Sequence, residues 1–169
     1  MLSAAMLPLW IGLTLAAWSD VQHRKVPNVL TGPLACAGLI LAALGLGPVS
    51  LWTAILAMSV AFGLMVLPFT LRLFLGGDLK LLVAASAWLT PRGVVWAFLI
   101  GIIAGGVWGL AQVLFRPSAL RRLIVEIRLI ILSAKFTAPE PTEAQGTVPM
   151  AVTFGLGVFY AAAGYRLWP

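Results

Sequence analysis

The stretch that decides the fold of this chain reads Phe74-Leu75-Gly76-Gly77-Asp78-Leu79-Lys80-Leu81, where a carboxylate follows two glycines between long apolar runs. The only other aspartate, Asp20, ends the first apolar run. A charged side chain at membrane depth costs about 2.5 kcal/mol or more, so such residues usually face the interior of a helical bundle and mark function. We therefore expect both carboxylates to be functional, and they could form one site.

The composition excludes an ordinary soluble domain. Of the 169 residues, 62% are apolar and 9% are charged, whereas about a quarter of the residues of a soluble domain are charged. The net charge of +6 comes from basic residues in short connections between apolar runs, a pattern that argues against nucleic-acid binding. Cys36 is the only cysteine, which excludes an intrachain disulfide and a cysteine-based metal site, and we expect it to be buried.

The apolar runs predict an all-α, polytopic integral membrane protein with six transmembrane helices. The first run lacks the basic start and the cleavage site of a signal peptide, so we expect it to be retained. Pro27 precedes the second run and Asn28 is its expected N-cap. The expected spans are residues 2–19, 29–45, 49–71, 79–89, 93–115 and 148–167, with a tight turn at 45–48.

The fourth span is unusually short. Its eleven residues cover about 17 Å at 1.5 Å per residue, roughly half of the hydrocarbon core. If this helix reaches the far surface at Trp88, then Asp78 must lie inside the bundle.

Residues 116–147 are too charged to cross a membrane and are expected to be a cytoplasmic part of a single domain that comprises residues 1–169. Within them, residues 119–136 place Arg121, Arg128 and Lys135 at heptad spacing, opposite an apolar face. This pattern predicts a basic amphipathic helix on the membrane surface, followed by a polar loop at 137–143.

The basic residues also predict the topology. Nine of the eleven Lys and Arg residues lie in the connections after the first, third and fifth spans or, in the case of Lys80, at the edge of one, and only Arg92 and Arg166 fall on the other side. The positive-inside bias therefore places both termini outside and both aspartates at the cytoplasmic end. Tryptophans are expected at the two membrane boundaries, with Trp18 at the inner one and Trp52, Trp88 and Trp168 at the outer one.

Two carboxylates at the same membrane face suggest aspartic-protease chemistry. Carboxyl groups within a few ångströms of each other cannot both ionise easily, so the pair shares one proton. The ionised member removes a proton from water while the other polarises the scissile carbonyl. Gly76 and Gly77 would let a substrate backbone come close to Asp78. This chemistry needs no cofactor and no metal.

These residues resemble the type IV prepilin peptidases, a family of intramembrane aspartic proteases with six helices. Asp20, followed after seven residues by Pro27-Asn28, is similar to the family's first-aspartate motif, and Gly77-Asp78-Leu79-Lys80 is similar to its second. Leu75 stands where the family usually has the first glycine of Gly-x-Gly-Asp, and Val148-Pro149-Met150-Ala151 stands where a Pro-Tyr-Gly signature commonly opens the last helix.

The resemblance implies that Asp20 and Asp78 are catalytic and that Gly76, Gly77, Lys80, Pro27 and Asn28 bind substrate or support the site. The substrate would be a prepilin or pseudopilin whose basic leader is cleaved at the cytoplasmic face of the bacterial inner membrane. The chain is most similar to the short peptidases of tight-adherence (Flp) pilus systems, which lack the methyltransferase insertion. Two alternatives remain at this point: a small ion-coupled transporter that uses the two acids, and a non-catalytic assembly factor of a pilus or secretion machine.

Overall fold

The computed structural model describes residues 4–23, 26–70, 74, 76–115 and 150–164. These residues form helices and connecting turns, and no strand occurs among them. Leu75 and the surface helix and loop predicted within 116–147 lie outside the described residues. The elements are a 3₁₀ turn η1 (Ala4–Met6) and the helices α1 (Leu7–His23), α2 (Asn28–Ala43), α3 (Leu51–Thr70), α4 (Gly76–Ser86), α5 (Pro91–Phe115) and α7 (Met150–Gly164).

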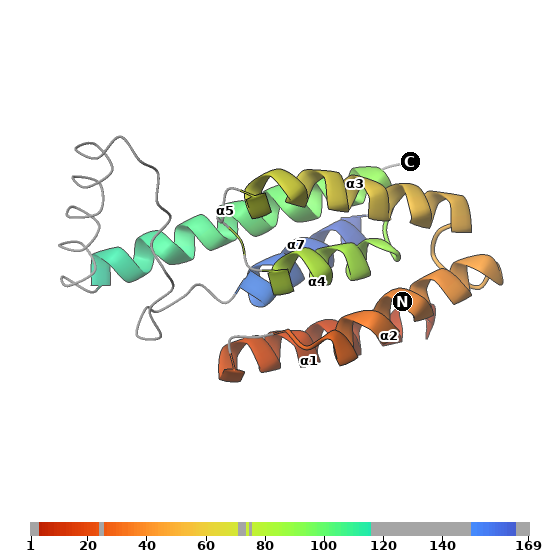
Figure 1. The fold of residues 1–169 in the computed structure, drawn as a ribbon, viewed down its shortest axis with the longest axis horizontal. Coiled ribbons are helices and arrows are strands. Elements are labelled where there is room, and N and C mark those ends of the chain that lie inside the picture. Colours follow the sequence, from red (N-terminus) through yellow and green to blue (C-terminus); the bar gives the residue numbers. More distant parts are fainter. Residues whose placement is uncertain (1–3, 24–25, 71–73, 75, 116–149, 165–169) are drawn as a thin grey trace.

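Helix α4 lies at the centre of the bundle and contacts every other described helix (Figure 1). In Figure 1, α4 and α7 run between α1 and α2 on one side and α3 and α5 on the other. A helix that is apolar all round must be buried. After the exposed Lys80, every residue of α4 except the partly buried Val83 is buried: Leu81, Leu82, Ala84, Ala85 and Ser86.

The structure keeps the predicted length of the fourth helix but moves it three residues toward the N-terminus. It has eleven residues, as expected, and begins at Gly76 instead of Leu79. The chain after it turns within the protein interior, so Trp88 is 1% exposed and its indole N–H donates a hydrogen bond of 3.1 Å to the carbonyl oxygen of Leu34 on α2. Trp88 is therefore enclosed by protein and does not face lipid as a tryptophan of an aromatic belt does, while its depth in the membrane stays a prediction.

Helix α1 continues beyond its predicted end and includes Asp20. No proline or glycine interrupts residues 19–23, so the helix runs on to His23. Pro27 then occupies the N-cap position of α2 in an extended conformation, with φ −71° and ψ 144°. Asn28 is the first residue of α2, so the prediction that it is the N-cap is wrong.

The buried residues of α2 explain why Cys36 is exposed. Thr31, Leu34, Gly38 and Ala42 recur at helical spacing along its inner face. Cys36 lies two residues from both Leu34 and Gly38, and therefore on the opposite side of the helix, where it is exposed. The prediction that Cys36 is buried is wrong.

The turn between α2 and α3 agrees with the prediction. Gly45 has a positive φ of 68°, which side-chain-bearing residues adopt only with strain. The backbone N–H groups of Leu46 and Gly47 both donate to the carbonyl oxygen of Leu41. These bonds satisfy the end of α2 and reverse the chain.

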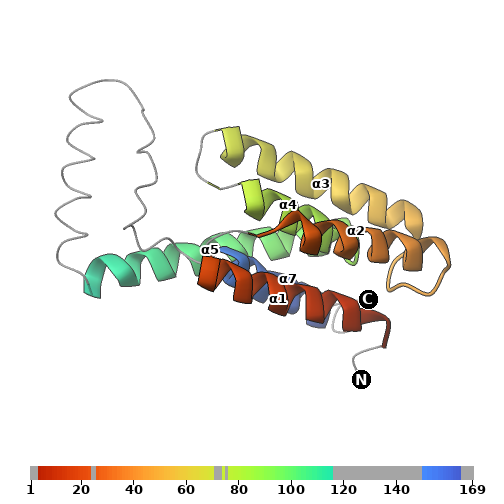
Figure 2. The same ribbon diagram turned by 60° about the horizontal axis from the view of Figure 1, so that its bottom comes forward.

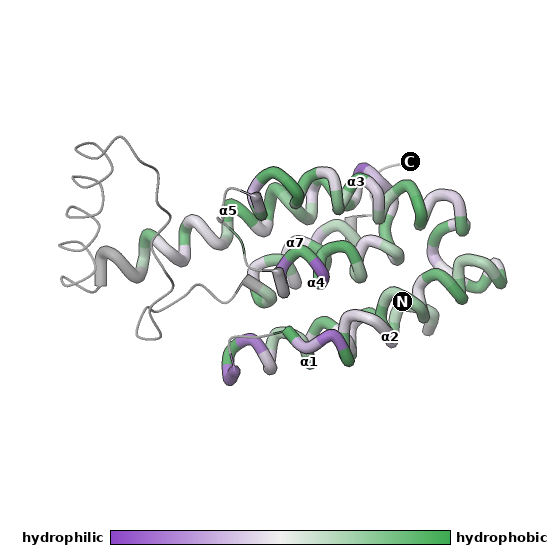
Figure 3. Tube along the Cα trace, in the orientation of Figure 1, coloured by the Kyte–Doolittle hydropathy of each residue, from purple (hydrophilic) through white to green (hydrophobic). Residues whose placement is uncertain are grey.

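Two described helices are long and apolar enough to cross a membrane: Leu51–Thr70 and Pro91–Ala111. Two shorter apolar helices, Asn28–Ala43 and Ala151–Ala163, accompany them. Figure 3 shows mostly hydrophobic colour along the described chain, with hydrophilic segments at the carboxyl end of α1 and near the amino end of α4. The composition of the helices is thus consistent with a membrane protein.

Helices α5 and α7 pack closely through glycine. A β-carbon built at Gly157 would overlap the backbone carbonyl oxygen of Ala97, and one built at Gly101 would overlap the ring of Phe154. The missing side chains let the two backbones approach, as small residues do at helix interfaces.

We expect Gly157→Ala to lower the melting temperature of the detergent-solubilised protein, because the carbonyl of Ala97 can yield only if α5 shifts. Overpacking of this kind typically costs about 1–3 kcal/mol of unfolding free energy. Gly155→Ala is the matched control on the same helix: a methyl group there meets no atom within 4 Å, and alanine stabilises a helix by roughly 0.5–1 kcal/mol relative to glycine. A melting temperature for Gly157→Ala at or above that of the parent protein would contradict the close approach.

Candidate functional site

The two aspartate-bearing stretches meet at one end of the bundle. Figure 2 shows the carboxyl end of α1 and the amino ends of α2 and α4 together at that end. Val26, just before Pro27, is buried against the first turn of α4: a β-carbon at Gly77 would lie 3.5 Å from both the backbone nitrogen and the Cβ of Val26. The two predicted motifs, about fifty residues apart in sequence, are therefore in direct contact.

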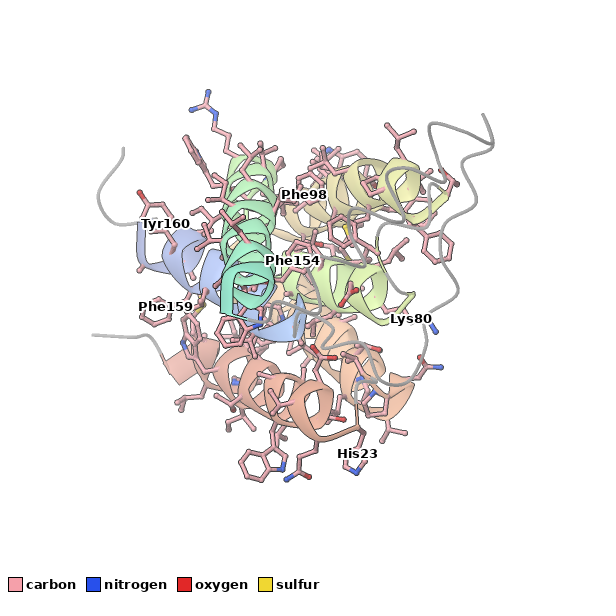
Figure 4. All side chains as sticks on the ribbon, turned by 90° about the vertical axis from the view of Figure 1, so that its left-hand side faces the viewer. His23, Lys80, Phe98, Phe154, Phe159 and Tyr160 are labelled. Atoms are coloured by element: carbon pink, nitrogen blue, oxygen red, sulfur yellow. The ribbon has the colours of Figure 1, made fainter. Side chains whose placement is uncertain are left out.

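A hydrogen bond of 3.0 Å from Lys80 Nζ to Asn28 Oδ1 forms a second link between the motifs. Both side chains are exposed, and Figure 4 shows Lys80 at the periphery of the bundle. Because Asn28 opens α2 and Lys80 lies in the second turn of α4, the bond ties the two helices together near their amino ends.

Asp78 is the buried carboxylate of this end. It is the third residue of α4 and is 3% exposed, in agreement with the inference from helix length that it lies inside the bundle. An acidic side chain in the first turn of a helix interacts favourably with the partial positive charge of the helix N-terminus. This placement reduces the cost of keeping an acid in the interior.

Asp20 is half-buried on α1, a helix that contacts α4. Its Oδ2 accepts a hydrogen bond of 2.9 Å from the backbone N–H of Ala151, in the first turn of α7. Asp20 lies outside the first predicted membrane span, which ends at residue 19. Burial raises the pKa of the Asp20 carboxyl above its usual value of 3.8, and the hydrogen bond from Ala151, which favours the ionised form, offsets part of that rise.

The two glycines of the second motif face other parts of the chain. Val26 lies beside Gly77, and the ring of Phe69 is the nearest group to a β-carbon built at Gly76, at 3.7 Å. These distances are those of ordinary contacts. Gly77 therefore packs against the start of α2 at a distance that would also accommodate a β-carbon.

The contact between α7 and Asp20 is a feature of this site that the sequence did not predict. The hydrogen bond to Asp20 comes from a backbone group, so the residue type at position 151 does not predict it. The available signal was positional: Pro149-Met150-Ala151 opens the last apolar run, where the family signature is expected.

The described residues contain no group of three or more His, Cys, Asp or Glu side chains that could hold a metal ion. His23 is exposed at the end of α1 (Figure 4). Among the described residues, the polar side chains at this end of the bundle include Asp20, His23, Asn28, Asp78 and Lys80.

The structure thus places one acid on the central helix α4 and a second acid on α1, a helix that contacts it. A model of the type IV leader peptidase family matches residues 7–110, which include both aspartates. The chain belongs to that family.

Its relatives include the prepilin leader peptidase/N-methyltransferases of Aeromonas salmonicida strain A449 and Aeromonas hydrophila. They are 32% and 33% identical over 120 residues, which cover 67% of this chain. The chain spans only 40% to 41% of the length of these relatives. No solved structure matches it.

The link between Asn28 and Lys80 can be tested by a double-mutant cycle of Asn28→Ala and Lys80→Met. Because both partners are exposed and water competes for them, we expect a coupling of about 0.5–1 kcal/mol in the free energy of unfolding. Lys80→Met combined with Ser59→Ala, which removes an exposed hydroxyl on α3, is the control and should be additive within about 0.3 kcal/mol. Additivity in the Asn28 and Lys80 cycle would contradict the link.

Proposed function

We propose that this protein is an intramembrane aspartic endopeptidase that cleaves the basic leader peptide of prepilins or pseudopilins, with Asp20 and Asp78 as its catalytic pair. The observation that carries the proposal is the meeting of the two aspartate-bearing stretches at one end of the bundle, through Val26 and Gly77 and through Asn28 and Lys80. Family membership supports it, because the relatives are named for leader peptidase activity.

The reaction follows from two carboxyl groups that share one proton. The ionised carboxylate takes a proton from water as the water oxygen attacks the scissile carbonyl carbon, while the protonated partner donates its proton to the carbonyl oxygen. When the tetrahedral intermediate collapses, the C–N bond breaks and a proton passes to the leaving amine. The apparent pKa values of such a pair belong to the pair and not to one residue.

Site-supporting roles are proposed for the remaining motif residues. Pro27 holds the extended entry into α2, Asn28 and Lys80 join α2 to α4, and Gly77 packs against Val26. Gly76, the other glycine of the pair, packs against the ring of Phe69. Together they fix the position of the first turn of α4, and therefore of Asp78.

The proposed setting is the bacterial inner membrane. Six spans of a single domain, residues 1–169, would place both termini outside and the aspartates at the cytoplasmic end, as nine of the eleven basic residues indicate. The basic leader of a substrate would then lie on the same side as the site. The proposed activity is the peptidase step without N-methylation.

We expect Asp20→Asn and Asp78→Asn each to reduce cleavage of a co-expressed prepilin from the same genome by about 10²–10⁴-fold, because each removes one acid–base group of the pair. Processing is read as a mobility shift on a gel, and folding is checked by thermal unfolding. Cys36→Ser is the control: the thiol is exposed on α2, away from the carboxylates, and full activity of this variant also excludes a cysteine nucleophile.

Normal processing by either aspartate variant would refute the catalytic pair. Absence of cleavage by the parent protein, together with uptake driven by a pH gradient, would instead establish an ion-coupled transporter. Absence of both activities, with loss of pilus assembly on deletion, would establish a non-catalytic assembly factor.

The proposed topology can be tested with single cysteines in a Cys36→Ser background. His23→Cys and Ser50→Cys replace exposed residues at the carboxyl end of α1 and at the start of α3, respectively. A membrane-impermeant maleimide should label Ser50→Cys in intact spheroplasts and His23→Cys only after the membrane is opened. The reverse pattern would overturn the orientation.

A further inference from the structure

The first two turns of α7 contact both halves of the candidate site. At its start, the backbone N–H of Ala151 donates to Asp20 Oδ2 at 2.9 Å. One turn further on, the ring of Phe154 packs edge-on against Phe74, with ring centroids 5.7 Å apart. Phe74 lies two residues before Gly76, so α7 reaches the stretch that leads into Asp78.

The position of this turn is firmly fixed by packing. Phe154 is buried, stacks on Phe98 of α5 at 6.4 Å between centroids, and lies in the interior of the view along the bundle (Figure 4). Gly157 lies against the backbone of Ala97, as described above. Because α5 holds α7 in place, α7 cannot shift along its axis without moving the Ala151 amide, which donates the hydrogen bond to Asp20.

Ala151 itself has no side-chain role at the carboxylate. It is fully buried, and its contribution is the N–H group of the first helical turn. The first N–H groups of a helix lack partners within the helix, so one of them can be given to a carboxylate at no cost to the helix. Charge-assisted bonds of this type are shorter and stronger than neutral ones.

We propose that the start of α7 is a positioning element of the active site: the amide of Ala151 orients the Asp20 carboxylate, and Phe154, one turn further on, links the same helix to the segment before Asp78. The catalytic consequence rests on the proposed function, whereas the placement of Asp20 does not. Helix α7 lies outside residues 7–110, which the family model matches. The site is thus completed by a part of the chain that the match does not include.

The placement can be tested by NMR without any assay of activity. Met150-Ala151 is the only Met–Ala pair in the sequence, so labelling with carbonyl-¹³C methionine and ¹⁵N alanine selects the Ala151 amide alone. Its proton should move downfield as the Asp20 carboxyl ionises, because the hydrogen bond to the charged form is stronger.

The charged groups that could interfere are few among the described residues. Asp78 and Lys80 lie on α4 and His23 on α1 itself, while α2 and α7 carry only the titratable Cys36 and Tyr160. The titration of the Ala151 resonance should vanish in Asp20→Asn and persist in Asp78→Asn. A resonance that does not move with pH, or that still moves in Asp20→Asn, would overturn the proposal.

The catalytic consequence is tested with Ala151→Pro, which deletes the N–H group at a position in the first helical turn where proline is tolerated. We expect kcat for prepilin cleavage to fall about tenfold or more, with KM little changed. The acid limb of the kcat profile should move to higher pH, because loss of the hydrogen bond raises the pKa of Asp20 further.

Ala151→Gly is the matched control, since it changes the same residue but keeps its backbone N–H group. It should retain the parent acid limb. An Ala151→Pro variant with the parent kcat and acid limb would refute the positioning role. If the parent protein cleaves no prepilin, the proposed function fails, and the NMR titration still decides whether α7 holds Asp20.

Discussion

The structure depends on burying Asp78 in the first turn of a short central helix. A carboxylate that is 3% exposed must be surrounded by protein, so α4 needs neighbours on all sides. The other five described helices supply them, and α4 contacts each one. The apolar remainder of α4 provides the burial that makes this arrangement stable, while the helix N-terminus favours the negative charge. The central position of α4 thus accounts both for the arrangement of the other helices around it and for the burial of Asp78.

Contacts between the two motifs explain why these residue types occur together. Gly77 lacks a side chain where Val26 packs, and Lys80 has the length to reach Asn28 at 3.0 Å. Several of the motif residues thus join the start of α2 to the start of α4.

Much of the fold could be predicted from sequence because it depends on local physics. The eleven-residue length of α4, the burial of Asp78 and the turn at Gly45 follow from apolar runs, helix rise and backbone strain. The errors at Cys36 and Asn28 have another origin. Pro27 takes the N-cap position predicted for Asn28. Which side of α2 is exposed at Cys36, and that the Trp88 indole meets the carbonyl of Leu34, depends on how the helices pack.

The contact between Asp20 and Ala151 shows why one part of the candidate site leaves no clear pattern in the sequence. A backbone amide is supplied by every residue except proline, so the residue at position 151 can change while the donor to Asp20 stays in place. What must be kept is the position of the helix, and that is fixed by Phe154 and Gly157 further along α7. The hydrogen bond to Asp20 therefore depends on where α7 begins and not on the side chain at its donor, so Ala151 can supply it in a chain that lacks the Pro-Tyr-Gly signature.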